Sequence, residues 1–126
     1  MATPSNNNSY LDHPERLKIF FSPRSLNIKL SGDPIEINQI KEQVEKLIKA
    51  CDPSADDICG LYIPISFLFK MLGFDWLDNT GNLMHTRSRG DSFTLSIECN
   101  SGVEKALAEA FQRKYPNIAV KITNRR

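Results

Sequence analysis

The fold of this chain is decided by residues 93–122, which read FTLSIECNSGVEKALAEAFQRKYPNIAVKI. In residues 93–99 apolar and polar side chains alternate without a break, which is the pattern of a strand with one buried face. A helix is expected next, with Ser101 as its N-cap and Glu104 completing a capping box. Residues 118–122 predict a second strand. A strand, a helix and a strand with tight connections imply a right-handed crossover between parallel strands, either as neighbours or with another strand between them.

The part of the chain that precedes this unit predicts a hairpin and a helix with a well-marked start. Residues 17–21 and 26–30 each alternate apolar with polar side chains, and a Ser-Pro turn separates them. Asp33 has the position of an N-cap, and Pro34 follows it in the first helical position. Apolar residues then recur at helical spacing as far as Cys51. We therefore expect a helix with one buried face that includes this cysteine.

The middle of the chain predicts a short helix and a second hairpin. Pro64 suits the first position of a helix, and Gly73 suits the position just after its end. Residues 83–88 alternate weakly and pair naturally with residues 93–99 as the two arms of a hairpin. Gly90 lies in the turn between them, where a positive φ is needed.

Together these elements predict an α+β fold, in which three helices cover a mixed sheet of about five strands in a two-layer sandwich. The expected right-handed βαβ unit forms its C-terminal part. The chain has 126 residues, of which 40% are hydrophobic and 25% charged, and these are ordinary values for a globular domain with one core. Residues 1–13 are polar and rich in asparagine, so we expect a flexible N-terminal tail followed by a single domain over residues 14–126.

Composition also bears on the compartment and on bound groups. The formal net charge is +1, so overall electrostatics predicts no particular partner. Cys51, Cys59 and Cys99 have neither the number of a disulfide framework nor the spacing of a zinc site. The N-terminus has no apolar signal region, and no apolar run approaches the roughly 18 residues of a membrane span. We expect a cytoplasmic protein with no membrane association, no bound metal and no cofactor.

Residues 63–77 carry the leading functional hypothesis. Apolar side chains dominate this stretch, and Lys70 and Asp75 are its only charged residues. A helix that is apolar on all sides is either deeply buried or covered by a partner. The stretch therefore predicts a non-catalytic protein-interaction or adaptor domain, which binds a protein partner or a second copy of the chain. The expected contact residues are Phe67, Phe69, Phe74 and Trp76.

Nucleic-acid binding is the second hypothesis, and it rests on a basic surface. From residue 64 onward the chain holds nine basic and six acidic residues. Six candidates lie on the predicted hairpin or in and after the last strand: His85, Arg87, Arg89, Lys121, Arg125 and Arg126. If those strands lie side by side, their outward side chains form one patch that contacts phosphates. No aromatic residues interleave with these charges, whereas a sheet that recognises RNA bases exposes aromatics on its open face.

A small enzyme of unknown reaction is the third hypothesis. It ranks last because the sequence contains no recognised catalytic motif. It has no nucleophile elbow, no Walker loop and no dinucleotide-binding fingerprint. His85 is the single histidine inside the predicted fold, and no catalytic residue is assigned. Residues 110–120 resemble the helix-to-strand junction of extracellular solute-binding proteins. That resemblance covers eleven residues, which describe a helix stopped by Tyr-Pro and returned to a strand, and no function is carried over from it.

Overall fold

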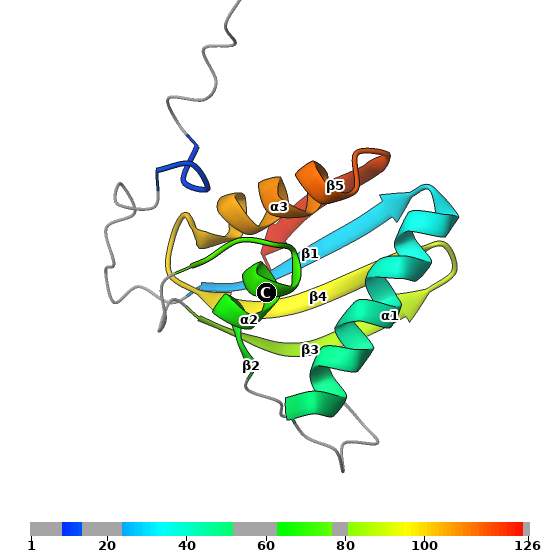
Figure 1. Ribbon diagram of the computed structural model, residues 1–126, viewed down its shortest axis with the longest axis horizontal. Helices are drawn as coiled ribbons and strands as arrows, with labels where there is room; N and C mark the ends of the chain where they lie inside the picture. Colours follow the sequence, from blue (N-terminus) through cyan, green and yellow to red (C-terminus); the bar gives the residue numbers. More distant parts are fainter. Residues whose placement is uncertain (1–8, 14–23, 52–62, 77–80, 125–126) are drawn as a thin grey trace, which may run out of the picture.

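The computed structural model describes residues 9–13, 24–51, 63–76 and 81–124. Within these parts of the chain, three helices pack on one face of a five-stranded sheet, as Figure 1 shows. The helices are α1 (Pro34–Cys51), α2 (Ile65–Met71) and α3 (Val103–Lys114). The strands are β1 (Arg24–Gly32), β2 (Ile63–Pro64), β3 (Gly81–Arg89), β4 (Ser92–Cys99) and β5 (Ile118–Asn124).

The predicted α+β class and the two layers are confirmed, and the sheet has the strand order β2-β3-β4-β1-β5. Every neighbouring pair among these five strands is antiparallel, which differs from the mixed sheet that we expected. The reason is the position of β1, which pairs with β4 along one edge and with β5 along the other. The two strands joined by α3 therefore run parallel to each other, but they are not neighbours.

Two of the predicted helix boundaries are confirmed by local contacts. The Asp33 carboxylate accepts a hydrogen bond from the backbone N–H of Glu36 at 3.2 Å, as an N-cap does. At the end of α2, Gly73 has φ of +94° and follows the C-cap residue Leu72. This is the left-handed position that glycine occupies after many helices.

The start of α3 differs from the expected capping box. The N-cap is Gly102, with φ of +97°, and not Ser101. Because the chain turns in the left-handed region at this glycine, the helix begins one residue later and no side chain caps it. One half of the box is replaced by a related contact, since a Glu104 carboxylate oxygen accepts a hydrogen bond from the Gly102 N–H at 3.0 Å.

The core lies between the sheet and the helices. Its largest fully buried side chains come from both layers. They include Leu26, Ile28 and Leu30 of β1, Leu95 and Ile97 of β4, Ile40 of α1, Phe69 of α2 and Phe111 of α3. Cys99 is buried in this core, as predicted, whereas Cys51 is exposed. The expectation for Cys51 is wrong, because this residue is the last of α1 and the buried stripe of that helix ends at Ile48.

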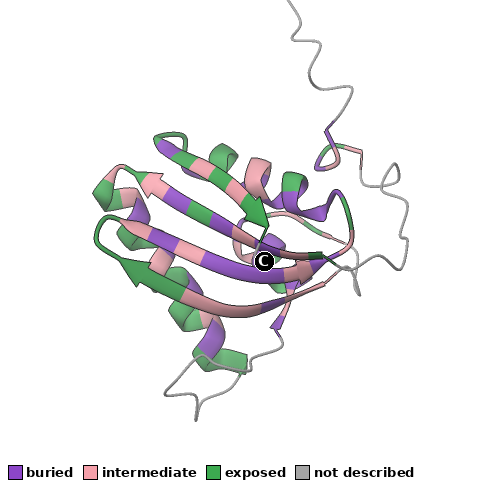
Figure 2. Ribbon diagram, turned by 180° about the vertical axis from the view of Figure 1, so that it is seen from behind, coloured by how far each residue is buried: buried purple, intermediate pink, exposed green. Residues whose placement is uncertain are grey.

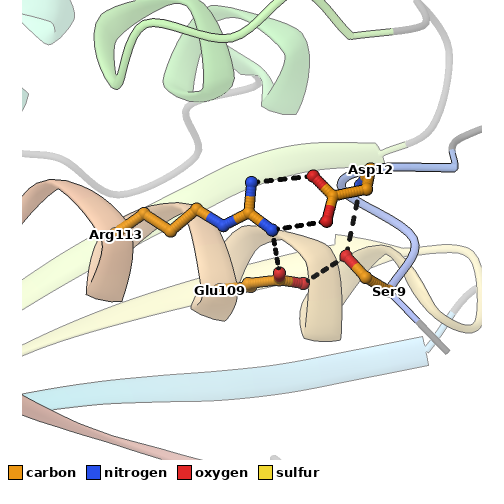
Figure 3. A network of polar contacts seen from close by, with 4 residues as sticks. All are labelled: Ser9, Asp12, Glu109 and Arg113. Atoms are coloured by element: carbon orange, nitrogen blue, oxygen red, sulfur yellow. Dashed lines mark hydrogen bonds and ion pairs between the residues drawn. The ribbon is translucent and has the colours of Figure 1, made fainter. Parts of the chain in front are cut away.

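Residues 9–13, which we assigned to the N-terminal tail, lie against α3 (Figure 3). Arg113 donates two hydrogen bonds to the Asp12 carboxylate, at 2.8 and 2.6 Å, and a third to Glu109 at 2.6 Å. The Ser9 hydroxyl donates to Glu109 at 2.8 Å and accepts from the backbone N–H of Asp12 at 3.2 Å. The hydrogen bond from Arg113 lowers the pKa of the Asp12 carboxyl and raises the pKa of the guanidinium. Leu11, from the same segment, is buried against the core.

Some of the expected features lie outside the described residues. These are the strand over residues 17–21, Cys59, Leu77, Arg125 and Arg126. Among the helices that the structure describes, none combines the length and the apolar character needed to cross a bilayer.

Candidate nucleic-acid interface

The sheet has one face that none of the described elements covers (Figure 2). Along β4 the residues Phe93, Leu95 and Ile97 are buried under the helices, and Thr94 between them is half-buried on the opposite side. The same alternation in β1 leaves Lys29 exposed between two buried residues. Every second residue of the central strands therefore points to this uncovered face of the sheet, which we call the open face.

A row of cations crosses the open face. Arg87 of β3 lies opposite Thr94 of β4, which lies opposite Lys29 of β1, which in turn lies opposite Lys121 of β5. Residues directly opposite each other in an antiparallel pair share a face, so these four side chains point the same way. Arg87, Lys29 and Lys121 are all exposed. With strands about 4.8 Å apart, the backbone at Arg87 is roughly 10 Å from that at Lys29 and roughly 14 Å from that at Lys121.

A β-bulge in β3 determines which side chains join this row. Leu83 pairs with Ile97, but the next pair is His85 with Ser96, so Met84 is an extra residue on the β3 side. Strict alternation would place Leu83 and His85 on one face. Because of the bulge, Leu83 is buried in the core while His85 points to the open face. The following alternate positions, Arg87 and Arg89, point there as well.

The basic side chains surround a hollow of about 320 Å³ on the open face. Its walls are four basic and four neutral polar residues, namely Lys29, His85, Arg87, Arg89, Asn27, Ser92, Thr94 and Ser96. None of the described residues that line it is acidic. The floor is ordered, since the Ser96 hydroxyl donates a hydrogen bond to the side-chain oxygen of Asn27 at 2.8 Å.

The cations of the open face have no acidic partner within the parts of the chain that the structure describes. The ion pairs found there join Arg24 to Glu104 and Arg113 to Asp12 and Glu109. Glu98 also points to the open face, but it lies at the far end of β4, opposite Ser25, whose hydroxyl it contacts at 3.5 Å. The positive charge around the hollow is therefore left for solvent or for a ligand.

Four of the residues predicted from the sequence lie on this face, although β3 and β5 are separated by two strands and are not side by side as the predicted patch required. His85, Arg87 and Arg89 come from β3, and Lys121 comes from β5. Sequence reasoning missed Lys29, although its alternation with buried neighbours was visible, because nothing in the sequence showed that β1 lies between β4 and β5.

The apolar stretch over residues 63–77 is largely used for packing in its described part. Phe69 is fully buried, and its ring stacks on Trp76 with the centroids 4.2 Å apart and the planes 14° from parallel. Phe74 and Trp76 are half-buried, and Phe67 is 43% exposed. Of the four expected contact residues, Phe67 is thus the most exposed.

A smaller pocket of about 190 Å³ lies beside α2, and we call it the α2 pocket. It is lined by Ser66, Phe67, Lys70, Phe74, Asp75 and Trp76. The Ser66 hydroxyl and the indole nitrogen of Trp76 are buried, and neither has a hydrogen-bond partner among the residues that the structure describes. A buried polar atom without a partner costs about 1–3 kcal/mol, so this pocket is a second place where a ligand group would be stabilised.

The buried thiol of Cys99 has none of the properties of a nucleophile. Burial, and then the nearby Glu104 carboxylate, raise the pKa of Cys99 to about 12. The thiol donates a long hydrogen bond to Glu104 at 3.8 Å, and Arg24 contacts the other oxygen of that carboxylate at 3.3 Å. A thiol with such a pKa stays protonated at neutral pH, so the cluster is a structural one.

Comparison of the chain with models of protein families, with curated proteins and with solved structures finds no match.

Proposed function

We propose that this protein binds nucleic acid by contacting phosphates with the open face of its sheet. The observation that carries the proposal is the row of exposed cations, Arg87, Lys29 and Lys121, next to a hollow whose lining contains no acid. Arg89 extends the charge along β3. This proposal develops the second of the hypotheses drawn from the sequence.

The physical case rests on how closely these charges are placed. Like charges on neighbouring strands repel each other, and directly opposite like charges such as Lys29 and Lys121 destabilise a strand pair. A polyanion removes that repulsion, and its condensed counterions are released when the phosphates are neutralised. The backbone ladder fixes where each cation is attached before binding, although each long side chain that a phosphate orders still costs about 0.5–1.5 kcal/mol.

The proposal is tested by reversing the charge of lysine and arginine residues, either on the open face of the sheet or on the helix layer, and comparing nucleic-acid binding. The variant K29E/R87E reverses two charges on the open face. The control K46E/K49E reverses two exposed lysines on α1, on the other side of the sheet, with the same change in net charge. Fluorescence anisotropy with labelled RNA and DNA oligonucleotides should show binding by the unchanged protein and by the control, but not by K29E/R87E. Equal weakening by both variants would mean that binding follows net charge and not this face.

The α2 pocket supports a second candidate function, which is protein binding. The observation in its favour is the pair of unpartnered polar atoms, on Ser66 and Trp76, beside the exposed ring of Phe67. The indole N–H can only donate, so a partner would have to present an acceptor such as a backbone carbonyl. A second copy of the chain is the partner that can be tested directly. Light scattering across a range of protein concentrations should show association that Phe67→Asp removes, and a monomer at every concentration would rule out self-association.

A further inference from the structure

The open face has an ordered arrangement of neutral and basic side chains. The hydroxyl-bearing residues Ser92, Thr94 and Ser96 follow each other along β4. The cations of β3 flank this strip on one side, and Lys29 and Lys121 flank it on the other. The face therefore carries cations on both sides of β4, namely the β3 cations along one side and the Lys29–Lys121 pair across β1 and β5 on the other.

The spacing of these two groups of cations selects the kind of groove that would fit. The backbone of β3 is roughly 10 Å from that of β1 and roughly 14 Å from that of β5, as two or three strand separations require. The minor groove of B-form DNA is only about 6 Å wide, which is narrower than the spacing of these cations. The major groove of B-form DNA is about 8.5 Å deep, so its bases are contacted by an element that enters the groove. A sheet face without a protruding element suits neither of these two grooves. The minor groove of an A-form helix is wide and shallow, and its two edges are phosphate backbones.

The hydroxyl groups of β4, which lie between the two groups of cations, can form hydrogen bonds with groups that an A-form minor groove displays. The minor groove of double-stranded RNA displays 2′-hydroxyl groups, which both donate and accept hydrogen bonds. Serine and threonine hydroxyls also do both. The Ser96 hydroxyl is buried and donates to Asn27 at 2.8 Å, and the Ser92 hydroxyl donates to the backbone carbonyl of Arg89 at 2.9 Å. Thr94 is therefore the hydroxyl-bearing residue of this strip that is left to face a ligand.

Single-stranded nucleic acid is disfavoured by what the face lacks. Proteins that bind single strands stack the bases on aromatic side chains. Phe93 is the one Phe, Tyr or Trp residue in the described strands β1, β3, β4 and β5, and it is buried on the side of the helices. Among the described residues, the open face thus offers unpaired bases only the imidazole of His85 and the arginine guanidinium groups to stack on.

We infer that the ligand of the open face is double-stranded RNA, bound across its minor groove. The cations of β3 lie on one phosphate backbone, Lys29 and Lys121 lie on the other, and Thr94 contacts a 2′-hydroxyl group between them. This inference rests on the proposed function and makes it more specific.

The test compares three probes of one sequence at one salt concentration: a 20-base-pair RNA duplex, the same duplex as DNA, and the single RNA strand. Fluorescence anisotropy should give the tightest binding for the RNA duplex. Thr94→Val removes a hydroxyl at nearly constant shape and suits a strand. It should weaken binding of duplex RNA about threefold to tenfold, as expected for the loss of one or two hydrogen bonds, and leave duplex DNA unchanged.

Two further variants control for folding and for position. Thr94→Ser retains the hydroxyl and should bind duplex RNA as the unchanged protein does. Thr86→Val makes the same substitution on the neighbouring strand, where Thr86 pairs with Leu95 and points toward the helices, and it should have no effect on binding. Circular dichroism confirms that each variant is folded.

The possible outcomes separate the inference from the proposed function. Equal binding of duplex RNA and duplex DNA, tighter binding of the single strand, or an equal loss with Thr94→Ser would overturn the inference while the proposed function stands. No binding of any probe would overturn both.

Discussion

Removing half of the exposed cations from the open face should halve the salt dependence of nucleic-acid binding. These cations are Lys29, Arg87, Arg89 and Lys121, and none of the four has an acidic partner among the described residues. If each neutralises one phosphate of a DNA duplex, the logarithm of the binding constant falls with the logarithm of salt concentration with a slope of about −3.6. The variant K29A/R87A leaves two contacts and a slope of about −1.8.

These slopes give a large difference in an accessible range of salt. Between 50 and 200 mM salt, a slope of about −3.6 weakens binding about 150-fold, whereas a slope of about −1.8 weakens it about 12-fold. The measurement is fluorescence anisotropy with a labelled DNA duplex at five or more potassium chloride concentrations (roughly 50 to 200 mM), because the coefficient per contact is established for such duplexes.

The matched control is K46A/K49A, which removes two exposed lysines from α1 on the other layer of the molecule. Its slope should equal that of the unchanged protein, although the change in net charge is identical. A slope near zero for the unchanged protein would refute the reasoning, and so would a slope for K29A/R87A that is as steep as that of the control.

Three further predictions concern the fold. Leu95 of the central strand β4 is fully buried, so Leu95→Ala leaves a cavity in the core and should lower the free energy of unfolding, measured in urea, by about 2–5 kcal/mol. A decrease below about 1 kcal/mol would show that Leu95 is not buried in the core. The Arg113 guanidinium lowers the pKa of Asp12, so the contact of residues 9–13 with α3 is complete above the ordinary aspartate pKa of 3.8 and is lost as pH falls through the lower folded-state pKa. Amide NMR shifts of residues 9–13 should report this release. The same transition should be missing in Asp12→Asn. At pH 8 a thiol reagent should modify exposed Cys51 in the folded protein but Cys99, whose pKa burial raises to about 12, only after unfolding, as peptide mapping by mass spectrometry can verify.

Local patterns in the sequence were sufficient for most of the elements. The alternation over residues 93–99 and the apolar spacing after Asp33 both predicted elements that the structure contains. Such signals arise from neighbours within about four residues, since side-chain direction repeats every two residues in a strand and every 3.6 in a helix. The cap at Ser101 was predicted wrongly because the choice between it and Gly102 depends on the path by which β4 leads into α3.

The candidate site was predictable only in part. Alternation grouped His85, Arg87 and Arg89 on one side of a strand, and it also placed Lys121 outward from its own strand. Whether these two groups meet depended on strand order, which the sequence left open. Lys29 was missed for the same reason.

The sequence by itself determined which segments become strands and helices and which side chains each of them turns outward, because these properties depend on nearby residues. The tertiary structure alone decided that β1 lies between β4 and β5, and that the bulge at Met84 turns the cations of β3 away from the core. Backbone hydrogen bonds in a sheet join residues far apart in the chain, and a shift of one residue exchanges the two faces of a strand. The basic face is therefore a property of the assembled sheet, although every residue in it can be read from the sequence.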